Sequence, residues 1–494
     1  MGKSCEELLE GLGAAVAGEC DGPIEGLAFR SDRVEPGFAF FCIVGLKADG
    51  HRFAQDAVDR GARLVVAQRE LELENASGVA VAVVGDTRAA MASVAARYYG
   101  EPSAAFDLVG ITGTNGKTTT TFVIDHIVSS AGRRCGIIGT TGNRVGDVME
   151  TAANTTPESV DLQHLFARMR DAGNDVVAME VSSHALDLRR TWATRFAVTA
   201  FTNLTQDHLD YHHTFEAYFE AKAKLFGPDY PARRGVCIDD EWGAELARRC
   251  REAGDELLTT GFDPAADIHP VEVSYATDGT RVRLSVRGEE LEVEYPLVGR
   301  FNVSNVMTAF AVALHLGIPA ADIATALRDV PGVPGRLERI SESGCPDVFV
   351  DYAHTPDAVE KALASVMALN PRRTIVVFGC GGDRDATKRP LMGKAALAAD
   401  YAIVTSDNPR TEDPDAIIAD IVAGMGDAPG RFEVVPDRRA AILRAIELAD
   451  EESAVLVAGK GHEDYQIIGT TKIDFDDRKV VSAALQEKAR RIVG

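Results

Sequence analysis

The chain has 494 residues, of which 46% are hydrophobic and 26% are charged, and its 52 Lys and Arg against 75 Asp and Glu give a formal charge of −23. Because a domain usually holds about 100–200 residues, this length predicts a globular protein of three domains. The negative charge argues against nucleic acid as a partner, although a local nest of N–H groups can still bind a small anion.

The cysteines and the hydropathy indicate the compartment. The eight cysteines are scattered without a Cys-x-x-Cys pair, so the sequence indicates neither a metal site nor a disulfide framework and fits a reducing compartment. The N-terminus lacks the apolar core of a signal peptide, and no stretch offers the ~20 apolar residues that a membrane span requires. We therefore expect a cytoplasmic protein without membrane insertion.

The first segment reads as a small α/β domain. Short apolar runs at 39–44, 64–67 and 79–84 alternate with helical patterns. The turn signal Glu101-Pro102-Ser103 follows them, so we place this domain over residues 1–103.

The most informative motif opens the second segment. Gly113-Thr114-Asn115-Gly116-Lys117-Thr118-Thr119 lies between an apolar run and a helical pattern, and its glycines let successive N–H groups converge on phosphate oxygens. Lys117 would face the β- and γ-phosphates, and the Thr118 hydroxyl would bind Mg²⁺. Strict Walker spacing would place Gly where this chain has Ile111, so the loop is a shorter relative of that motif. It predicts a nucleoside triphosphate user.

Two polar sites follow later apolar runs of this segment. Glu180 ends the run 175–179, where a carboxylate can hold the Mg²⁺ that bridges phosphates, although a lone strand-end Glu more often faces solvent. The loop from Thr202 to His212 gathers carboxylates, an amide and imidazoles, which favours a second cation site.

The end of the second segment changes pattern. Apolar residues alternate with period two between Val271 and Tyr295, which predicts a small antiparallel patch, and a helix is expected over 302–316. Pro331 to Gly335 is the clearest linker of the chain. We therefore predict a central P-loop ATPase-like domain with a parallel sheet over 104–333.

The third segment, residues 334–494, repeats strand then helix. The strands are expected at 348–350, 375–378, 402–404, 434–435 and 455–458. This repetition predicts a Rossmann-like, doubly wound domain, in which ligands bind at the carboxyl ends of the strands. Polar stretches do follow these strands, at 351–354, 379–384, 407–410 and 459–463.

Six motifs run through nearly the whole chain in one order: Gly-Thr-Asn-Gly-Lys-Thr (113–118), Glu-Val-Ser-Ser-His (180–184), Thr-Asn-Leu-x-x-Asp-His-Leu-Asp (202–210), Ala-Lys-x-x-Leu-Phe (221–226), Gly-Arg-Phe-Asn (299–302) and Asp-Tyr-Ala-His-Thr-Pro-Asp (351–357). Together they resemble the Mur ligases of peptidoglycan assembly. Within that family the chain is similar to the members that add the third peptide residue, and Asp407-Asn408-Pro409-Arg410 looks like the form that adds meso-diaminopimelate.

The resemblance implies an ATP- and Mg²⁺-dependent amide ligase. The carboxylate of UDP-MurNAc-L-Ala-D-Glu would attack the γ-phosphate to give an acyl phosphate, which the amine of meso-diaminopimelate then displaces. Phosphoryl transfer of this kind needs mainly positioning and charge stabilisation. By resemblance Lys117, His208 and Lys222 are catalytic, Lys222 reacts with CO₂ to form a carbamate, and the metal ligands are Thr118, Glu180, His208 and carbamylated Lys222.

The substrate-binding residues also follow from the resemblance. Asn302 and Asp351 would join the 113–119 loop in binding ATP. The expected contacts of the nucleotide-sugar dipeptide, held by an N-terminal domain for UDP-MurNAc, are Ser31, Leu46, Lys47, Ala48, Asn154, Thr155, Thr156, Ser182 and Arg190. The family usually reads Asp-Ser-Arg where this chain has Arg30-Ser31-Asp32, so Ser31 alone stays in register.

Amino-acid selection is expected in the third segment. Lysine and meso-diaminopimelate differ by a distal carboxylate, to which a guanidinium offers two parallel donors, so Arg410 is the predicted selector. Asn-Pro also favours a plain turn, but a turn can present the arginine as well. The remaining expected contacts of meso-diaminopimelate are Arg384, Asp407, Asn408, Pro409, Gly459 and Glu463.

Several alternatives stay open. The same ligase could use L-lysine, or the chain could be a ligase like folylpolyglutamate synthetase, which shares the phosphate loop and the carbamylated-lysine region. A nucleotide-binding regulatory or scaffold protein, or a P-loop motor or GTPase, fits the combined motifs less well. We expect small-molecule substrates, no nucleic acid and a monomer.

Overall fold

The computed structural model describes residues 2–45, 48–426 and 428–493. The chain divides into two compact units, each of which is described here by itself. The first unit comprises Met1–Thr112, Gly132–Ala200 and Phe219–Arg234, and the second comprises Gly113–Ala131, Phe201–Tyr218 and Gly235–Gly494.

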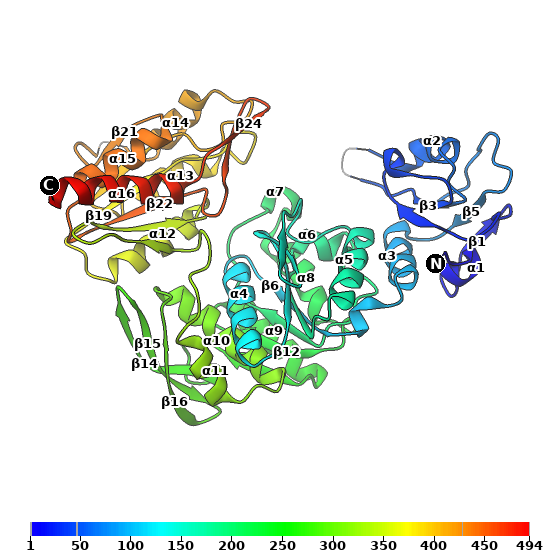
Figure 1. Cartoon of the computed structure of the whole chain (residues 1–494), viewed down its shortest axis with the longest axis horizontal. Helices are drawn as coiled ribbons and strands as arrows, with labels where there is room; N and C mark the ends of the chain where they lie inside the picture. Colours follow the sequence, from blue (N-terminus) through cyan, green and yellow to red (C-terminus); the bar gives the residue numbers. More distant parts are fainter. Residues whose placement is uncertain (1, 46–47, 427, 494) are drawn as a thin grey trace. The chain divides into compact units, whose positions relative to one another are not determined.

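The first unit begins with a five-stranded sheet in the order β1-β5-β4-β3-β2 (Figure 1, blue). Strands β2 to β5 pair in parallel, and β1 joins β5 antiparallel. Phe40 and Val65 face one apolar cluster while Phe41 and Val66 face another, so both sides of the sheet are covered and the strands are continuously apolar. The elements of this stretch are α1 (Cys5–Leu9), β1 (Ala15–Ala17), β2 (Gly26–Ala28), η1 (Ser31–Arg33), β3 (Phe38–Phe41), η2 (Gly50–Phe53), α2 (Ala54–Asp59), β4 (Leu64–Ala67), β5 (Ala80–Val83), α3 (Thr87–Tyr98) and η3 (Pro102–Ala104).

The rest of the first unit carries a parallel core with a hairpin at its edge. Strand β10 lies between β6 and β7 and is parallel to both, while β7, β8 and β9 pair antiparallel. The run predicted at 175–179 is β10, and it ends at Glu180 as expected. The elements are β6 (Asp107–Thr112), β7 (Cys135–Gly139), β8 (Gly142–Val145), β9 (Val148–Glu150), α5 (Ser159–Asp171), β10 (Val176–Glu180), α6 (Ser183–Asp187), β11 (Val198–Phe201), α8 (Phe215–Ala223), η4 (Lys224–Phe226) and β12 (Arg233–Cys237), of which β11, α8 and β12 extend into the segments of the second unit.

The second unit starts with the phosphate loop and the helix after it, and it contains the predicted antiparallel patch. Strands β14, β15 and β16 form this patch over the predicted residues, and the helix expected at 302–316 is α10. The elements are α4 (Lys117–Ser130), α7 (Leu209–His212), α9 (Glu241–Ala253), β13 (Leu257–Thr260), β14 (Ile268–Ala276), β15 (Gly279–Val286), β16 (Glu289–Tyr295), α10 (Arg300–His315) and α11 (Ala320–Leu327).

A six-stranded sheet in the order β17-β18-β22-β19-β20-β21 forms the end of the second unit (Figure 1, yellow to red). Strands β18 to β21 and β22 are parallel, and β17 is antiparallel to β18. Ile375 and Val377 face one apolar cluster and Val376 and Phe378 face the other, which confirms the doubly wound prediction. The elements are β17 (Glu338–Ile340), β18 (Asp347–Asp351), α12 (Pro356–Met367), β19 (Arg373–Phe378), α13 (Lys388–Ala396), β20 (Tyr401–Val404), α14 (Pro414–Ala423), β21 (Phe432–Val434), α15 (Arg438–Leu448), β22 (Ser453–Ala458), β23 (Tyr465–Ile468), β24 (Thr471–Asp474) and α16 (Asp477–Val493).

Local signals explain where these helices begin. The side chain of Thr355 accepts a hydrogen bond from the N–H of Ala358, and Pro356 and Asp357 occupy the first turn of α12. This combination satisfies a free N–H group, presets the helical backbone and places a negative charge at the positive end of the helix. Asp240 caps α9 in the same manner.

The cysteines include a pair that the sequence analysis does not predict. Cys5 and Cys20 form a disulfide with their Cα atoms 6.7 Å apart, so the expectation of no disulfide is wrong for this pair. An antiparallel bridge between Lys3 and Ile24 brings the two segments side by side, a tertiary pairing that cysteine spacing alone does not reveal. The other six cysteines are buried.

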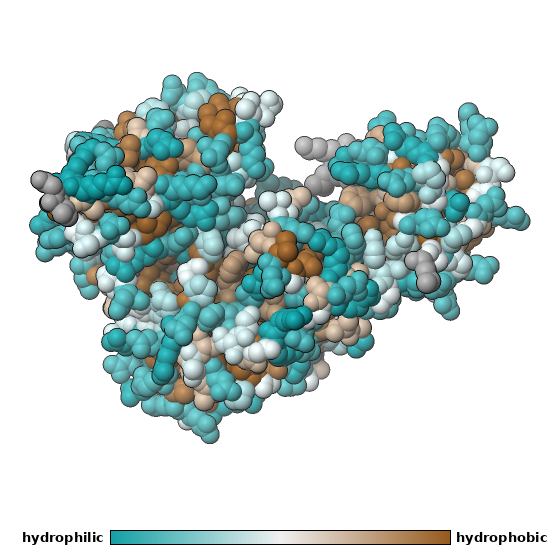
Figure 2. Space-filling model, viewed as in Figure 1, coloured by the Kyte–Doolittle hydropathy of each residue, from teal (hydrophilic) through white to brown (hydrophobic). Residues whose placement is uncertain are grey.

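The surface and the helix lengths bear on the membrane question. Hydrophilic residues cover most of the face shown in Figure 2. None of the helices in the described part of the chain is long and apolar enough to cross a membrane.

Candidate active site

The predicted phosphate loop has the backbone that its glycines permit. Gly113 has a φ of +147° and Gly116 a φ of +87°, both in the region that residues with a side chain rarely adopt. A Cβ atom at Gly113 would collide with the Thr202 hydroxyl, and one at Gly116 with Oδ1 of Asn305. The loop therefore curls against two polar side chains, which leaves no room for a residue larger than glycine.

A second loop holds the phosphate loop in place. The N–H of Thr114 donates to the carbonyl of Asn203 (2.8 Å), and the N–H of Asn115 donates to Oδ1 of Asn203 (3.0 Å). The Thr202 hydroxyl donates to the carbonyl of Asn115 (2.6 Å), and the N–H of Thr205 donates to the Thr114 hydroxyl (3.0 Å). Sequence analysis assigns this second loop to a cation, whereas these contacts also give Asn203 the role of a brace.

Lys117 is hydrogen-bonded to the backbone of its own loop. Lys117 Nζ donates to the carbonyls of Gly113 and Thr114, at 2.9 Å each. These bonds hold the ammonium group over the curled backbone, where incoming phosphate oxygens would meet it.

Arg336 is a candidate that the sequence analysis missed. Its Nη2 donates to the Thr118 hydroxyl (3.1 Å), and its guanidinium lies 4.8 Å from the ring centre of Tyr352. It directly follows Gly335, the last residue of the predicted linker, and a positive charge at that position was the sequence signal. The contact places a second positive charge at the residue predicted to bind Mg²⁺.

Asn302 and Asp351, the predicted adenosine contacts, are both buried. Asn302 donates to the carbonyl of Val298 (2.8 Å) and accepts from Asn305 (3.1 Å). Asp351 accepts from the N–H groups of Leu337 (2.6 Å) and Ala353 (2.8 Å), and burial raises the pKa of its carboxyl. Both side chains hold the surrounding backbone, and their contact with ATP stays a prediction.

Glu180 anchors a cluster in the first unit. The N–H and hydroxyl of Thr140 donate to its two carboxylate oxygens, at 3.0 and 3.1 Å. The Thr140 hydroxyl is 3.0 Å from that of Thr155, and the Thr156 hydroxyl donates to the Glu180 carbonyl (2.9 Å). Ser182 also belongs to this cluster, because its N–H donates to the Thr156 hydroxyl (3.1 Å). The predicted metal ligand and three predicted dipeptide contacts therefore lie together.

Arg190 joins this cluster through its neighbours. It donates to the Thr156 carbonyl (2.9 Å) and pairs with Glu158 (2.9 Å), which also pairs with Arg88 (3.2 Å). Asn154 is exposed on the same segment.

The other predicted dipeptide contacts lie in the first five-stranded domain. Ser31 begins η1, and the carbonyl of the exposed Ala48 accepts a hydrogen bond from the N–H of Gly45. Leu46 and Lys47 lie outside the described residues.

His208 and Lys222, the remaining predicted catalytic residues, differ in exposure. His208 has 46% of its side chain exposed, a φ of +54°, and Nε2 at 3.5 Å from Asp207. Lys222 is 1% exposed on α8. Among the described residues, no group of three or more His, Cys, Asp and Glu side chains could hold a metal ion, and the Mg²⁺ ligands inferred from the sequence stay a prediction.

Three polar loops meet in the third segment, after the neighbouring strands β22, β19 and β20. The N–H of Gly382, after β19, donates to the carbonyl of Asn408, after β20 (2.9 Å). Asn408 Nδ2 donates to Glu463, after β22 (3.0 Å). The structure thus brings the predicted amino-acid contacts together where ligands bind in doubly wound sheets.

Arg410, the predicted selector, is held by its backbone as well as its side chain. Its φ is +53°, its N–H donates to Ile467 (3.1 Å), and its carbonyl accepts from Gly469 (2.7 Å). Its Nη1 donates to the carbonyl of Gly382 (2.7 Å), beside the loop that carries the exposed Arg384. Arg410 and Arg384, the two arginines predicted to bind the substrate, therefore lie on loops that a hydrogen bond connects.

Asp407 keeps its charge in this site although it is buried. Burial alone would raise the pKa of its carboxyl, but the positive charges of Lys460 and Arg438 outweigh burial and lower it. Arg438 is itself paired with buried Asp477, at 2.8 and 2.7 Å.

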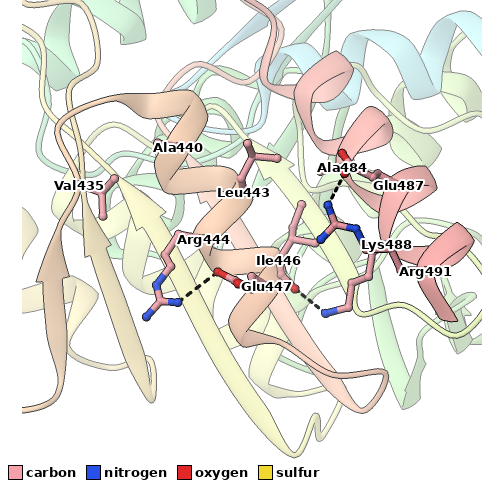
Figure 3. A pocket seen from close by; sticks show the side chains of 10 residues that line it. All are labelled: Val435, Ala440, Leu443, Arg444, Ile446, Glu447, Ala484, Glu487, Lys488 and Arg491. Atoms are coloured by element: carbon pink, nitrogen blue, oxygen red, sulfur yellow. Dashed lines mark hydrogen bonds and ion pairs between the residues drawn. The ribbon is translucent and has the colours of Figure 1, made fainter.

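A pocket of about 690 Å³ lies elsewhere, between α15 and α16 (Figure 3). Its cations already have partners: Arg444 donates to Glu447 (3.2 Å), Lys488 donates to the carbonyl of Ile446 (2.6 Å), and Arg491 pairs with Glu487. It contains none of the predicted site residues, so we do not assign the site to it.

Comparison with known proteins covers nearly the whole chain. Family models match in three parts, as Mur ligase family, catalytic domain (23–99), Mur ligase middle domain (111–313) and Mur ligase, glutamate ligase domain (335–461). A relative from Geobacillus thermodenitrificans, named UDP-N-acetylmuramoyl-L-alanyl-D-glutamate--2,6-diaminopimelate ligase, is 46% identical over 94% of this chain and 95% of its own.

Solved structures agree with these matches. A structure with the same ligase name has a TM-score of 0.72 and 33% identity, covering 99% of this chain and 100% of the other. The folylpolyglutamate synthase of Mycobacterium tuberculosis has a TM-score of 0.62 over 83% of this chain and 95% of its own, but at 22% identity this likeness shows the fold alone.

Proposed function

We propose that this chain, which belongs to the Mur ligase family, joins meso-diaminopimelate to UDP-MurNAc-L-Ala-D-Glu with the consumption of ATP. The reaction would supply a precursor of peptidoglycan. Relatives that bear this ligase name align along at least 94% of the chain, so the proposal concerns the whole protein.

One structural observation carries the proposal. The loops 381–384, 407–410 and 459–463 are tied together by hydrogen bonds at the carboxyl ends of adjacent parallel strands. They combine arginines with carboxylates in one place. An amino acid with two ammonium groups and two carboxylates requires such a mixture of donors and acceptors.

The phosphate loop fits ATP because its curled glycine backbone and Lys117 form an anion cradle. In the reaction, Lys117 would stabilise negative charge on the transferred phosphoryl group, and Arg336 would add charge beside Thr118. The γ-phosphate would pass to the D-Glu carboxylate, and the incoming amine would then displace phosphate from the acyl phosphate.

Mg²⁺ would supply charge neutralisation between the phosphates, with Thr118, Glu180 and His208 as candidate ligands. Lys222 is the candidate for carbamylation, in which its neutral amine adds to CO₂ and releases one proton. The product would be an anionic oxygen ligand where a cation would repel the metal.

The substrate assignments follow the same logic. We assign ATP to Gly113–Thr119 with Asn302 and Asp351, and the dipeptide to the cluster of Thr155, Thr156, Ser182 and Arg190. Arg410 would select meso-diaminopimelate over L-lysine because it can pair with the distal carboxylate.

The organisation of the chain is part of the proposal. We propose three domains over 1–103, 104–333 and 334–494, supported by family models that match one after another within them. A cytoplasmic monomer suits a reaction between ATP and nucleotide-linked and free amino-acid substrates.

The test is a ligation assay with purified protein, ATP, Mg²⁺, UDP-MurNAc-L-Ala-D-Glu and either amine. We expect product and ADP with meso-diaminopimelate. Product with L-lysine alone would overturn the specificity. No product with either amine, together with glutamylation of a folate in a parallel assay that supplies a folate and L-glutamate, would favour a ligase like folylpolyglutamate synthetase.

A further inference from the structure

A lysine with no solvent exposure lies at the centre of the proposed amino-acid site. Lys460 follows β22 between two glycines, and its side chain is 0% exposed. Its Nζ donates to Oδ1 of Asn408 (3.0 Å) and lies 3.6 Å from Asp407 and 3.5 Å from Glu463. All three partners are predicted contacts of meso-diaminopimelate, whereas Lys460 is not.

The contacts of Lys460 connect two loops that are distant in sequence. Asn408 accepts from Lys460 through Oδ1 and donates through Nδ2 to Glu463 (3.0 Å). The N–H of Ile467 also donates to Oδ1 of Asn408 (2.9 Å). The amide oxygen of Asn408 thus accepts from Lys460 and Ile467, while its amide nitrogen donates to the carboxylate of Glu463. These three bonds fix the orientation of Asn408 relative to Glu463.

Charge explains why a lysine is required at this point. Asp407 and Glu463 are two carboxylates within 3.6 Å of the same ammonium group. The nearby Arg438 already forms a two-bond pair with Asp477. Without Lys460, the negative charges of Asp407 and Glu463 would lose the ammonium group that lies within 3.6 Å of both, which is costly in a low-dielectric environment.

We propose that Lys460 is a positioning residue for the amino-acid substrate, which sets the orientation of Asn408 and Glu463 and balances the charge of Asp407. The inference rests on the proposed function and adds a residue to its amino-acid site. Lys460 itself is turned away from solvent and does not contact the substrate. Its removal weakens binding of the amino acid and leaves the ATP and nucleotide-sugar sites unchanged, because its ammonium group contacts Asp407, Asn408 and Glu463, which are all assigned to the amino acid.

The experiment compares Lys460→Met with Lys394→Met, the same substitution at an exposed lysine of α13 in the same domain. Steady-state kinetics give KM for meso-diaminopimelate, ATP and UDP-MurNAc-L-Ala-D-Glu. We expect Lys460→Met to raise KM for meso-diaminopimelate by about 30-fold or more, the usual effect of removing one partner of a buried charge pair. The other two KM values and kcat should change by less than about threefold.

A double-mutant cycle separates positioning from general damage. If Lys460 acts through Glu463, Lys460→Met will raise KM much less in a Glu463→Gln background than in the parent. If circular dichroism shows that Lys460→Met is unfolded, Lys460→Gln takes its place, because its amide can still donate to Asn408 but carries no charge.

The outcomes are distinct. An unchanged KM for meso-diaminopimelate in a folded variant, additive effects in the cycle, or an equal rise in all three KM values would overturn the role of Lys460. Absence of any turnover by the parent protein with meso-diaminopimelate would instead overturn the proposed function, and the inference with it.

Discussion

Replacement of Gly116 by alanine tests how the phosphate loop is built. At a φ of +87° an alanine costs roughly 1–2 kcal/mol because its Cβ crowds the backbone. The same Cβ would collide with Oδ1 of Asn305, and relief of such overpacking costs about 1–3 kcal/mol. The loop can escape only by moving, and its N–H groups would then leave the positions from which they bind phosphate.

The matched control is Gly132→Ala. Gly132 has a φ of +78°, but a Cβ there would meet nothing within 4 Å, so this variant carries the backbone strain without the collision. Titration calorimetry with a non-hydrolysable ATP analogue should show parental affinity for Gly132→Ala and a loss of about tenfold or more for Gly116→Ala. Equal affinity of the two variants would refute the argument that steric exclusion shapes the loop.

Three further predictions concern single residues. Arg336→Ala removes the hydrogen bond to Thr118, so KM for ATP should rise about tenfold; an unchanged value in steady-state kinetics would remove Arg336 from the site. Glu180→Gln keeps the shape of the proposed Mg²⁺ ligand but not its charge, so activity should require higher Mg²⁺ concentrations. A Mg²⁺ titration curve that does not shift would exclude Glu180 as a ligand. The lowered pKa of Asp407 implies stabilisation that is complete above the unfolded value of about 3.9 and is lost as pH falls through the lower folded value. Asp407→Asn should therefore lower the urea midpoint at pH 7, with the difference from the parent shrinking below about pH 4; a difference that does not depend on pH would contradict the sign.

The strands could be predicted from the sequence because their patterns are strong. The apolar runs at 64–67 and 375–378 lie in sheets covered on both faces, so nearly every residue is apolar. The patch between 271 and 295 has one more exposed face, which produces the alternation that predicted it. Polar loops after parallel strands then indicated where the third-segment site would lie.

The rest of the site depends on tertiary pairing. Asn203 braces Asn115 from 88 residues away, and Arg336 reaches Thr118 across 218 residues. The sequence assigned the loop of Asn203 to a cation and showed Arg336 only as a residue next to a linker, so neither position indicated its contact with the phosphate loop. Lys460 was not predicted as a site residue because a lysine between two glycines suggests an exposed loop. The fold buries its side chain completely.

The central claim is that this ligase uses meso-diaminopimelate and selects it through Arg410. The most direct measurement is the ratio of kcat/KM for meso-diaminopimelate to that for L-lysine, in the parent protein and in Arg410→Ala. We predict a strong preference for meso-diaminopimelate that collapses in the variant, because the distal carboxylate loses its guanidinium partner. A parent that prefers L-lysine, or a variant that keeps the parental ratio, would contradict the account.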